Sequence, residues 1–164
     1  MNKLIMYFML IITFISSTAQ NNDKLMIDEI SISTFSFEQT ELTLISILGN
    51  PDLITDYNNE IDNESWIEFK YSLNSFYFFN HQLISFNLRS NVFYFYNPNI
   101  VVGNNISLIE NIFPNSYSQK EVLNGLGFII IDITMEDESV SDSFIVINYD
   151  QSSSLITSIH IASK

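Results

Sequence analysis

The stretch that decides the fold is Ser75–Gln82, SFYFFNHQ, because a near-copy of it returns later as Ser143–Gln151, SFIVINYDQ. Both open with Ser-Phe, continue through aromatic or β-branched residues, and reach an asparagine just before a polar turn. Runs of this kind, bounded by turn residues, are typical of the first arm of a β-hairpin. An alternating second arm follows each of them, Leu83–Arg89 in the first copy and Ser158–Ile161 in the second. The repetition predicts a duplicated structural unit.

The residues before each copy extend the match. A further β-rich run precedes each hairpin, Trp66–Tyr71 in the first copy and Phe128–Ile133 in the second. In Trp66–Tyr71 the alternation places Ile, Phe and Tyr on one side of the strand and Trp, Glu and Lys on the other. Hairpin turns are expected at Asn80–Gln82 and Tyr149–Ser154, and Val92–Tyr96 is predicted as a fourth strand.

A stretch with helical spacing of apolar residues stands before each β-rich run. The first predicted helix covers Phe37–Leu48, where Ser36 and the glutamine three residues later have the spacing of a capping box. Gly49 ends this helix, because glycine readily takes the left-handed conformation beyond a helix end. The second predicted helix covers Ile106–Phe113 and stops at Pro114.

The predicted strands have one apolar face and one mixed face, which is typical of an antiparallel sheet with helices on one side. We therefore predict an α+β protein of two tandem repeats, each a helix packed on an antiparallel β-sheet, with the two sheets separate or joined into one curved sheet. The predicted organisation is a leading segment over residues 20–33 with a strand at Glu29–Ile32, a first repeat over 34–97 and a second over 98–164.

The chain begins with the three parts of a secretory signal. Lys3 supplies the positive charge, Leu4–Ile15 is an apolar run, and Ser17 and Ala19 are small residues at the positions that signal peptidases read. A membrane span needs about 20 apolar residues, so this run is too short for one. We expect residues 1–19 to be cleaved after Ala19 and the mature protein to be periplasmic or secreted; the alternative is an uncleaved anchor.

Composition excludes several classes of function. The chain has 6 Lys and Arg against 19 Asp and Glu, and without residues 1–19 it has 5 against 19, so the net charge changes from −13 to −14. Nucleic-acid binding needs clustered cations and is excluded. Because the chain has no cysteine, thiol catalysis, Cys-ligated metals and disulfides are excluded, and so is a lipid attached to cysteine. We expect no stable membrane anchor.

The order of helix, Leu48–Pro51 (LGNP), aromatic strand Trp66–Tyr71 and hairpin Phe76–Leu88 resembles the SmpA/OmlA (BamE-like) module. Two such modules in tandem, over about residues 35–162, resemble the β-lactamase inhibitory protein family. The second copy has Ile112–Pro114 (IFP) where Leu-Gly-x-Pro is expected, and this chain lacks the cysteines that such inhibitors use for disulfides. The resemblance implies binding of a protein through a sheet surface, and no inhibitory residue can be matched.

The first candidate site is the mixed face of the first predicted sheet. A large aromatic side chain can bury about 150–250 Å², and Trp, Tyr and Arg are enriched among interface anchors. The alternative is that the aromatic side chains pack on each other across strands or under the leading segment. The predicted partner-binding residues are Trp66, Glu68, Lys70, Tyr77, Phe79, Asn87 and Arg89, and Tyr94 and Tyr96 extend the face.

Two acidic clusters form a second group of candidates. Clustered carboxylates can hold Ca²⁺, but neither cluster has the spacing of an EF-hand loop, and we expect solvated hairpin tips instead. The clusters are Asp132, Glu136, Asp137, Glu138 and Asp142 in the second repeat, and Asp56, Glu60, Asp62 and Glu64 in the equivalent loop of the first.

The expected function is a non-enzymatic binding module, without cofactor or metal, that engages a protein partner as an inhibitor, an immunity protein or an envelope-assembly factor. His81, in a predicted turn, and His160, on a predicted polar strand face, lack the converging partners of a metal or general-base site. The alternative is a small-ligand carrier with an apolar cleft between sheet and helices. A third hypothesis is a hydrolase with two carboxylates, although no pair among the 19 acids stands out.

Overall fold

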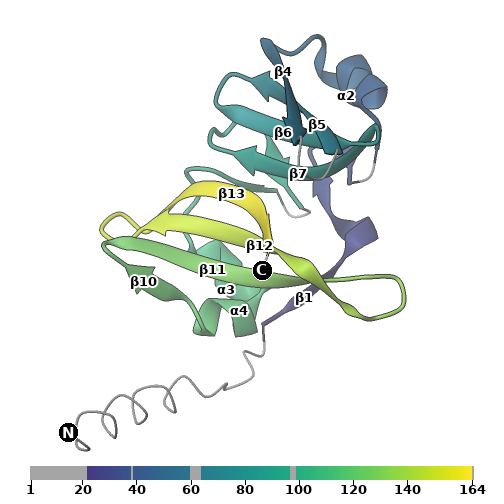
Figure 1. Ribbon diagram of the computed structural model, residues 1–164. Coiled ribbons are helices and arrows are strands. Elements are labelled where there is room, and N and C mark those ends of the chain that lie inside the picture. Colours follow the sequence, from purple (N-terminus) through teal and green to yellow (C-terminus); the bar gives the residue numbers. More distant parts are fainter. Residues whose placement is uncertain (1–21, 38, 60–63, 97–98, 164) are drawn as a thin grey trace, which may run out of the picture.

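The computed structural model describes residues 22–37, 39–59, 64–96 and 99–163 (Figure 1). Several sequence predictions fall outside these described residues: the signal peptide over residues 1–19, the junction between residues 97 and 98, and Glu60 and Asp62 of the first acidic cluster. Within the described ranges, no helix is long and apolar enough to cross a membrane.

Most strands belong to one nine-stranded sheet with the order β1-β11-β12-β13-β7-β6-β5-β4 and with β10 beside β11. The first half of the chain supplies an antiparallel set: β4 (Leu53–Asn59), β5 (Glu64–Tyr71), β6 (Asn74–Phe79) and β7 (Gln82–Leu88). The second half supplies β10 (Glu121–Leu123), β11 (Leu126–Thr134), β12 (Val140–Asp150) and β13 (Leu155–Ser163). A parallel pairing of β1 (Lys24–Met26) with β11 makes the sheet mixed.

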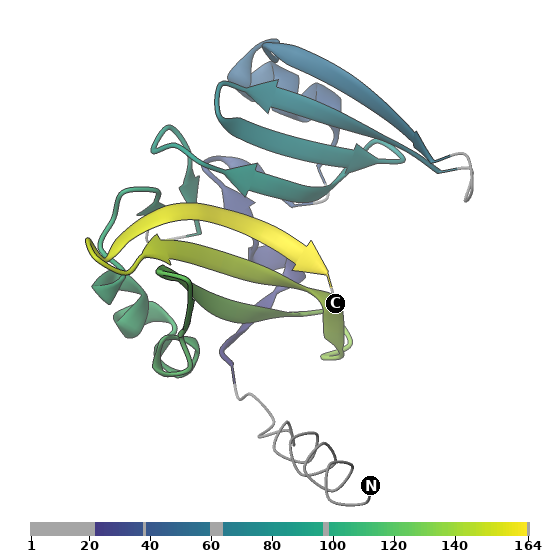
Figure 2. The ribbon, with the colours of Figure 1, turned by 60° about the vertical axis from the view of Figure 1, so that its left-hand side comes forward.

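The two predicted hairpins are confirmed as β6–β7 and β12–β13, and they meet at the centre of the sheet. Strands β7 and β13 pair antiparallel, with Leu88 opposite Ile159 and Asn87 opposite His160. The sheet is therefore continuous across both halves of the chain, and backbone hydrogen bonds join the halves. Figure 2 shows β13 and β7 side by side at this junction.

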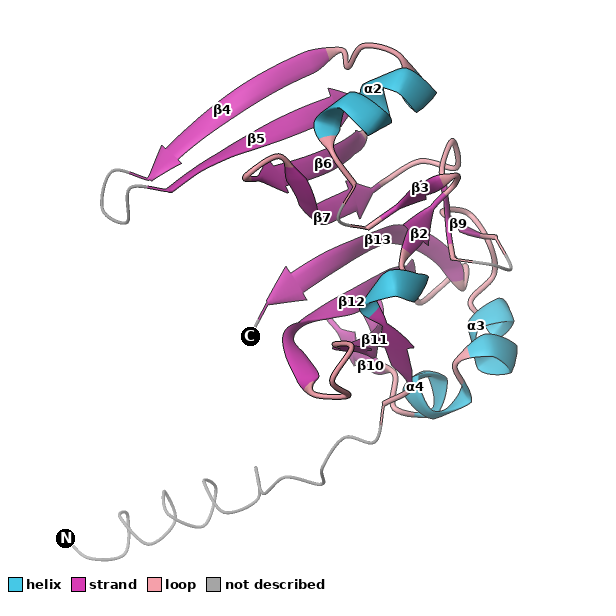
Figure 3. Cartoon of the chain, turned by 90° about the vertical axis from the view of Figure 1, so that its right-hand side faces the viewer, coloured by secondary structure: helices cyan, strands magenta, loops and turns pink. Residues whose placement is uncertain are grey.

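A small four-stranded sheet and the helices lie on one side of the large sheet (Figure 3). The small sheet has the order β3-β2-β8-β9. Its strands are β2 (Ser31–Ile32), β3 (Phe35–Ser36), β8 (Tyr94–Phe95) and β9 (Ile100–Val101). The helices are α2 (Glu41–Leu48), α3 (Ser107–Ile112) and α4 (Pro114–Ser118), with 8, 6 and 5 residues.

The core lies between the large sheet and this layer. Each core strand turns alternate apolar residues inward, as the period of two requires. The large sheet contributes Phe69, Phe76, Phe78, Leu83, Phe86, Leu88, Ile129, Ile131, Ile145, Ile147 and Ile159, and the covering layer contributes Ile30, Ile32, Phe35, Leu44, Phe95, Ile100, Ile109 and Phe113.

The predicted fold class, two tandem repeats of a helix packed on an antiparallel sheet, is wrong. The protein is mostly β, with one mixed nine-stranded sheet, a second small sheet and short helices. The small sheet supplies much of the layer that covers the core, where only helices were predicted. The β7–β13 pairing joins the two predicted sheets, which confirms the alternative of a single sheet. These pairings join segments far apart in the sequence, and local periodicity does not report them.

The first predicted helix was misplaced at its start. It begins at Glu41, because Thr40 is its N-cap and accepts a hydrogen bond from the Thr43 N–H at 3.4 Å, while Ser36 lies in β3. Its predicted end is confirmed, with Gly49 at φ 81°. The second predicted helix is confirmed as α3, which ends at Ile112 with Phe113 as its C-cap, before Pro114. Pro114 then opens a further short helix, α4, at its first position, where proline's missing N–H costs nothing.

Three strand predictions also need correction. Strict alternation along Leu83–Arg89 predicts Ile84, Phe86 and Leu88 on one face. In the structure Leu83 is buried and Ile84 is exposed, because a bulge between Tyr77 and Phe78 shifts the β6–β7 register. Glu29 belongs to a 3-10 turn before β2, not to a leading strand. Val92–Tyr96 contributes β8 to the small sheet, so it does not extend the first set of large-sheet strands.

Candidate functional site

The face of the large sheet turned away from the helices and the small sheet is called the outer face. The register places Trp66 opposite Phe79 and Glu68 opposite Tyr77 on β5 and β6, all on this face. All seven predicted partner-binding residues have outer-face positions: Trp66, Glu68, Lys70, Tyr77, Phe79 and Asn87 lie in β5–β7, and Arg89 directly follows β7 with the same alternation. Tyr94 and Tyr96, the predicted extensions, are elsewhere, and Tyr96 packs against Phe95 and Phe113.

An aromatic row crosses three neighbouring strands of the outer face. The ring of Trp66 lies 5.5 Å from that of Tyr57 on β4 and 6.4 Å from that of Tyr77 on β6, measured between centroids. The rings contact one another, yet Trp66 and Tyr57 keep 42% and 41% of their surface exposed. Cross-strand packing therefore orders the row without removing it from solvent. Tyr57 was not predicted, because the acidic residues around it indicated a loop where the structure has the strand β4.

Glu68 lies beside this row on β5, opposite Tyr77, and is 9% exposed. The Tyr57 hydroxyl donates a hydrogen bond to Glu68 Oε2 at 3.0 Å. Burial by itself would raise the pKa of Glu68, but hydrogen bonds from Ser75, Tyr57 and Tyr77 together with the Lys70 ammonium outweigh burial and lower that pKa. The carboxylate therefore stays ionised at neutral pH and fixes the phenol of Tyr57.

A carboxyl group with a lowered pKa makes stability depend on pH. Because the folded pKa of Glu68 lies below the unfolded value of about 4.3, its contribution is complete above the unfolded pKa and is lost as pH falls through the folded pKa. We expect Glu68→Gln to flatten the acid side of the stability curve, measured by urea unfolding at a series of pH values. Asp56→Asn, which removes an exposed acid on the next strand, is the control. Parallel curves for wild type and Glu68→Gln would contradict the role of Glu68.

Two cations lie on the same side of the aromatic row. Lys70 and Arg89 are both exposed, and neither forms a salt bridge with another residue in the described part of the chain. The backbone N–H of Arg89 donates to Asn74 Oδ1 at 2.9 Å, which fixes where the strand ends. In a chain with a net charge of −13, this pair gives the outer face local positive charge.

The junction between the two halves of the sheet is polar on the outer face. His160 lies opposite Asn87, and burial, with a smaller contribution from the Arg89 guanidinium, lowers the pKa of His160. Its imidazole is therefore neutral at neutral pH. Asn87 Oδ1 is buried and lacks a hydrogen-bond partner among the residues that the structure describes. No group of three or more His, Cys, Asp or Glu in that part of the chain could hold a metal ion.

The outer face of β11 and β12 carries an apolar patch that was not predicted from the sequence. Phe128, Ile130 and Phe144 are half-buried there, and Val146 is buried. At one end, Leu126 and Leu155 are exposed on either side of Asp150. The signal was present in the sequence, because the unbroken run Phe128–Ile131 is typical of a strand with apolar side chains on both faces.

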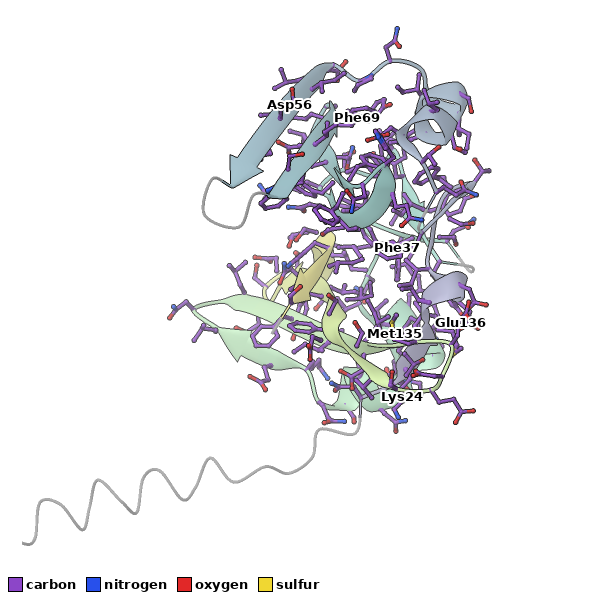
Figure 4. All side chains as sticks on the ribbon, turned by 45° about the vertical axis from the view of Figure 1, so that its right-hand side comes forward. Lys24, Phe37, Asp56, Phe69, Met135 and Glu136 are labelled. Atoms are coloured by element: carbon purple, nitrogen blue, oxygen red, sulfur yellow. The ribbon has the colours of Figure 1, made fainter. Side chains whose placement is uncertain are left out.

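The remaining candidates stay apart from one another. Asp137 Oδ1 accepts a hydrogen bond from the Ser139 N–H at 3.0 Å, and hydrogen bonds from Ser139 lower the pKa of Asp137 in an exposed hairpin tip. Figure 4 shows Glu136 of this tip at the opposite end of the molecule from Asp56, so the two acidic clusters do not converge. His81 is exposed and its Nδ1 lies 3.0 Å from Glu41 Oε2, which ties the β6–β7 turn to α2.

The hollows of the described part of the molecule are small. A depression of about 260 Å³ lies between the end of α2 and the sheet, with Leu48, Tyr71, Val92 and Phe93 among its lining residues. Another of about 390 Å³ lies beside Ile27 and the β11–β12 hairpin tip. Pockets for small molecules usually have volumes of about 300–1,000 Å³. The first hollow is the place where a small-ligand carrier would bind.

Comparisons with known proteins add little to this geometry. No protein-family model matches the chain, and no curated protein matches it. A structural match is the crystal structure of an extracellular protein containing a SCP domain from Bacillus anthracis str. Ames, with 8% sequence identity and a TM-score of 0.45. The match covers 78% of this chain and 44% of that chain, so this protein spans less than half of its length. A likeness at this level supports no conclusion about fold or function.

Proposed function

We propose that the chain is an exported, non-enzymatic binding protein that engages a protein partner through its outer face. The observation that carries the proposal is the exposed aromatic row of Tyr57 and Trp66 beside Lys70 and Arg89, which have no salt-bridge partners in the described ranges. Interfaces concentrate their binding energy in aromatic and arginine side chains at the centre of the contact. The rings of the row already pack against one another, so little side-chain ordering would oppose binding.

The charges of the outer face indicate what the partner presents. Lys70 and Arg89 would face acidic groups of the partner, because opposite potentials across an interface speed association and fix its register. The apolar patch of β11 and β12, with Phe128, Ile130 and Leu126, would face an apolar surface. Inhibitor, immunity protein and envelope-assembly factor are the roles that fit such a module.

The proposed location follows from the N-terminal sequence. Residues 1–19 have the pattern of a secretory signal, so the partner would be met in the periplasm or outside the cell after cleavage behind Ala19. The mode of binding proposed, through a sheet surface, is also the one that the resemblance to BamE-like modules and to β-lactamase inhibitory proteins implies, although the tandem helix-on-sheet fold of that resemblance is not observed.

The test uses the mature protein with a photo-crosslinking phenylalanine analogue in place of Phe79, which lies beside the aromatic row. After the crosslinked partner has been identified, the dissociation constant of its complex with each variant is measured. We expect Trp66→Ala to raise this constant at least about tenfold, because it removes one central anchor of the interface. Leu42→Ala is the control, because Leu42 is exposed on α2 and so on the helix side of the sheet. Equal affinity of wild type and a folded Trp66→Ala protein would refute the assignment.

A small-ligand carrier is the second candidate, and the hollow beside Leu48, Tyr71 and Phe93 favours it. It predicts a small molecule that remains bound to the purified protein in a native mass spectrum. Val92→Trp, which would fill the hollow from its exposed rim, should then release that molecule. A spectrum with the mass of the mature chain alone counts against this candidate.

A further inference from the structure

The two edges of the large sheet differ. At one edge, the free side of β11 is divided between two short strands, β1 and β10, each of three residues. At the other edge, β4 has seven residues and pairs with β5 along its whole length without a register shift. No described residue pairs with the free side of β4, and Figure 2 shows this strand as the border of the sheet.

Strand β4 has one of the features that normally protect a sheet edge and lacks the others. Proteins shield such edges with charged side chains, proline, bulges, short strands or a covering segment. The charge in β4 is Asp56, which lies on the inner face opposite Ile67. The sequence of β4 is LITDYNN, without lysine or proline, and its pairing with β5 contains no bulge. Leu53 and Ile54 are 54% and 53% exposed and project to opposite faces of the sheet. An unpaired edge of seven residues with apolar side chains on both faces is a template for another strand.

We propose that β4 is a docking edge that accepts an extended, cationic segment of a partner protein as an additional antiparallel strand. Main-chain hydrogen bonds supply the affinity in this mode of recognition, and alternate side chains supply the specificity. Apolar residues of the segment contact Leu53 and Tyr57 on the outer face and Ile54 on the other face. A lysine or arginine lies opposite Asp56, which is exposed and is the one charge within the strand.

A second copy of the chain fits this edge less well. Antiparallel self-pairing centred on Thr55 places Ile54 opposite Asp56 in both copies, so an apolar side chain faces a carboxylate twice. The net charge of −13 on each copy opposes the approach further. The acidic strand and the acidic protein instead complement a basic segment. This docking edge does not depend on the outer-face interface, although the two surfaces meet at Tyr57.

The probe is the peptide Lys-Val-Lys-Thr-Ile-Val-Lys with blocked termini, designed so that its second lysine lies opposite Asp56. The single Trp66 lies 5.5 Å from Tyr57, so its fluorescence reports on an added strand. We expect saturable binding and slower hydrogen exchange of the β4 amides. Two further peptides test the backbone hydrogen bonds: one has N-methyl groups on the odd-numbered amides and the other on the even-numbered amides. The peptide whose methyl groups replace the N–H groups that face β4 should bind at least about tenfold more weakly than the parent.

A charge exchange completes the test. Asp56→Lys should weaken binding of the lysine peptide and strengthen binding of a peptide with glutamate at its second lysine position, each by about tenfold. Arg89→Ala, directly after β7 and three strands from β4, should leave peptide binding unchanged even if it weakens partner binding through the outer face. Three results would overturn the docking edge. The first is binding of the lysine peptide that does not saturate. The second is equal affinity of the parent peptide and both N-methylated peptides, and the third is an Asp56→Lys protein that still prefers the lysine peptide to the glutamate peptide. Sedimentation tests the other occupant. If the wild-type protein forms a dimer and the peptide dissociates it, the edge binds a second copy of the chain and not a segment of a partner protein.

Discussion

Replacing Asn74 with alanine is expected to lower the free energy of unfolding by about 3–5 kcal/mol, because each buried group left without its partner costs about 1–3 kcal/mol. Asn74 is completely buried. Its Nδ2 donates to the Tyr71 carbonyl at 3.1 Å and to Ser90 Oγ at 2.8 Å. Its Oδ1 accepts from the N–H groups of Arg89 at 2.9 Å and Ser90 at 3.2 Å. One side chain therefore joins the start of β6 to the end of β7.

Urea unfolding of the Asn74→Ala protein measures this loss, and Gln82→Ala is the matched control, since Gln82 carries an exposed amide on β7. The control should change stability by less than about 0.5 kcal/mol. Because the Arg89 N–H loses its acceptor, Asn74→Ala should also weaken binding at the outer face while the protein is still folded. A loss of stability no larger than that of Gln82→Ala would show that these buried groups find other partners.

The hairpins were predictable because their signals are local. The β6–β7 turn needs two residues with positive φ, and Asn80 and His81 take φ values of 48° and 67° there. Asparagine tolerates this region well, and the aromatic run before it sets the strand. Alternation in β5 likewise placed Phe69 in the core and Glu68 on the outer face, as the structure confirms.

The rest of the fold depends on contacts that no local pattern encodes. The bulge that turns Leu83 inward and Ile84 outward depends on how β6 packs against β7. The pairing of β1 with β11 joins residues more than 100 positions apart. The leading segment therefore contributes an edge strand to the large sheet, and the sheets of the two predicted repeats form one sheet.

The candidate site shows the same division. Seven residues predicted from three strands share the outer face because a period of two fixes which side each occupies. Tyr94 and Tyr96 were wrong, because the chain leaves the large sheet after Arg89 and enters the small one. Tyr57 was missed, because its membership of the row depends on β4 pairing with β5, which places it opposite Trp66.

Gly127 gives a second test, in which a residue with better strand propensity is expected to destabilise the sheet. Gly127 lies in β11 opposite Tyr149, and its backbone is covered by the tyrosine ring. A Cβ atom at this position would meet the ring at 1.9 Å from Cζ and 2.3 Å from each Cε. The ring cannot swing into solvent without leaving the core, where Tyr149 is buried. We expect Gly127→Ala to lower the free energy of unfolding by about 2–4 kcal/mol, since forcing extra volume into a packed core costs about 1–3 kcal/mol and here also displaces an aromatic ring.

The double variant Gly127→Ala/Tyr149→Leu separates this cause from any other. If the clash is responsible, Gly127→Ala should lower the free energy of unfolding far less when leucine stands at position 149 than when tyrosine does. The coupling free energy between the two substitutions should then exceed about 1 kcal/mol. Gly125→Ala is the comparison, because Gly125 has φ 82° and a methyl group added there would meet nothing within 4 Å, so its cost is backbone strain alone. That cost should be the same with tyrosine or leucine at position 149. Additive effects of Gly127→Ala and Tyr149→Leu would mean that the ring moves aside freely and that the β11–β12 contact is looser than the burial of Tyr149 implies.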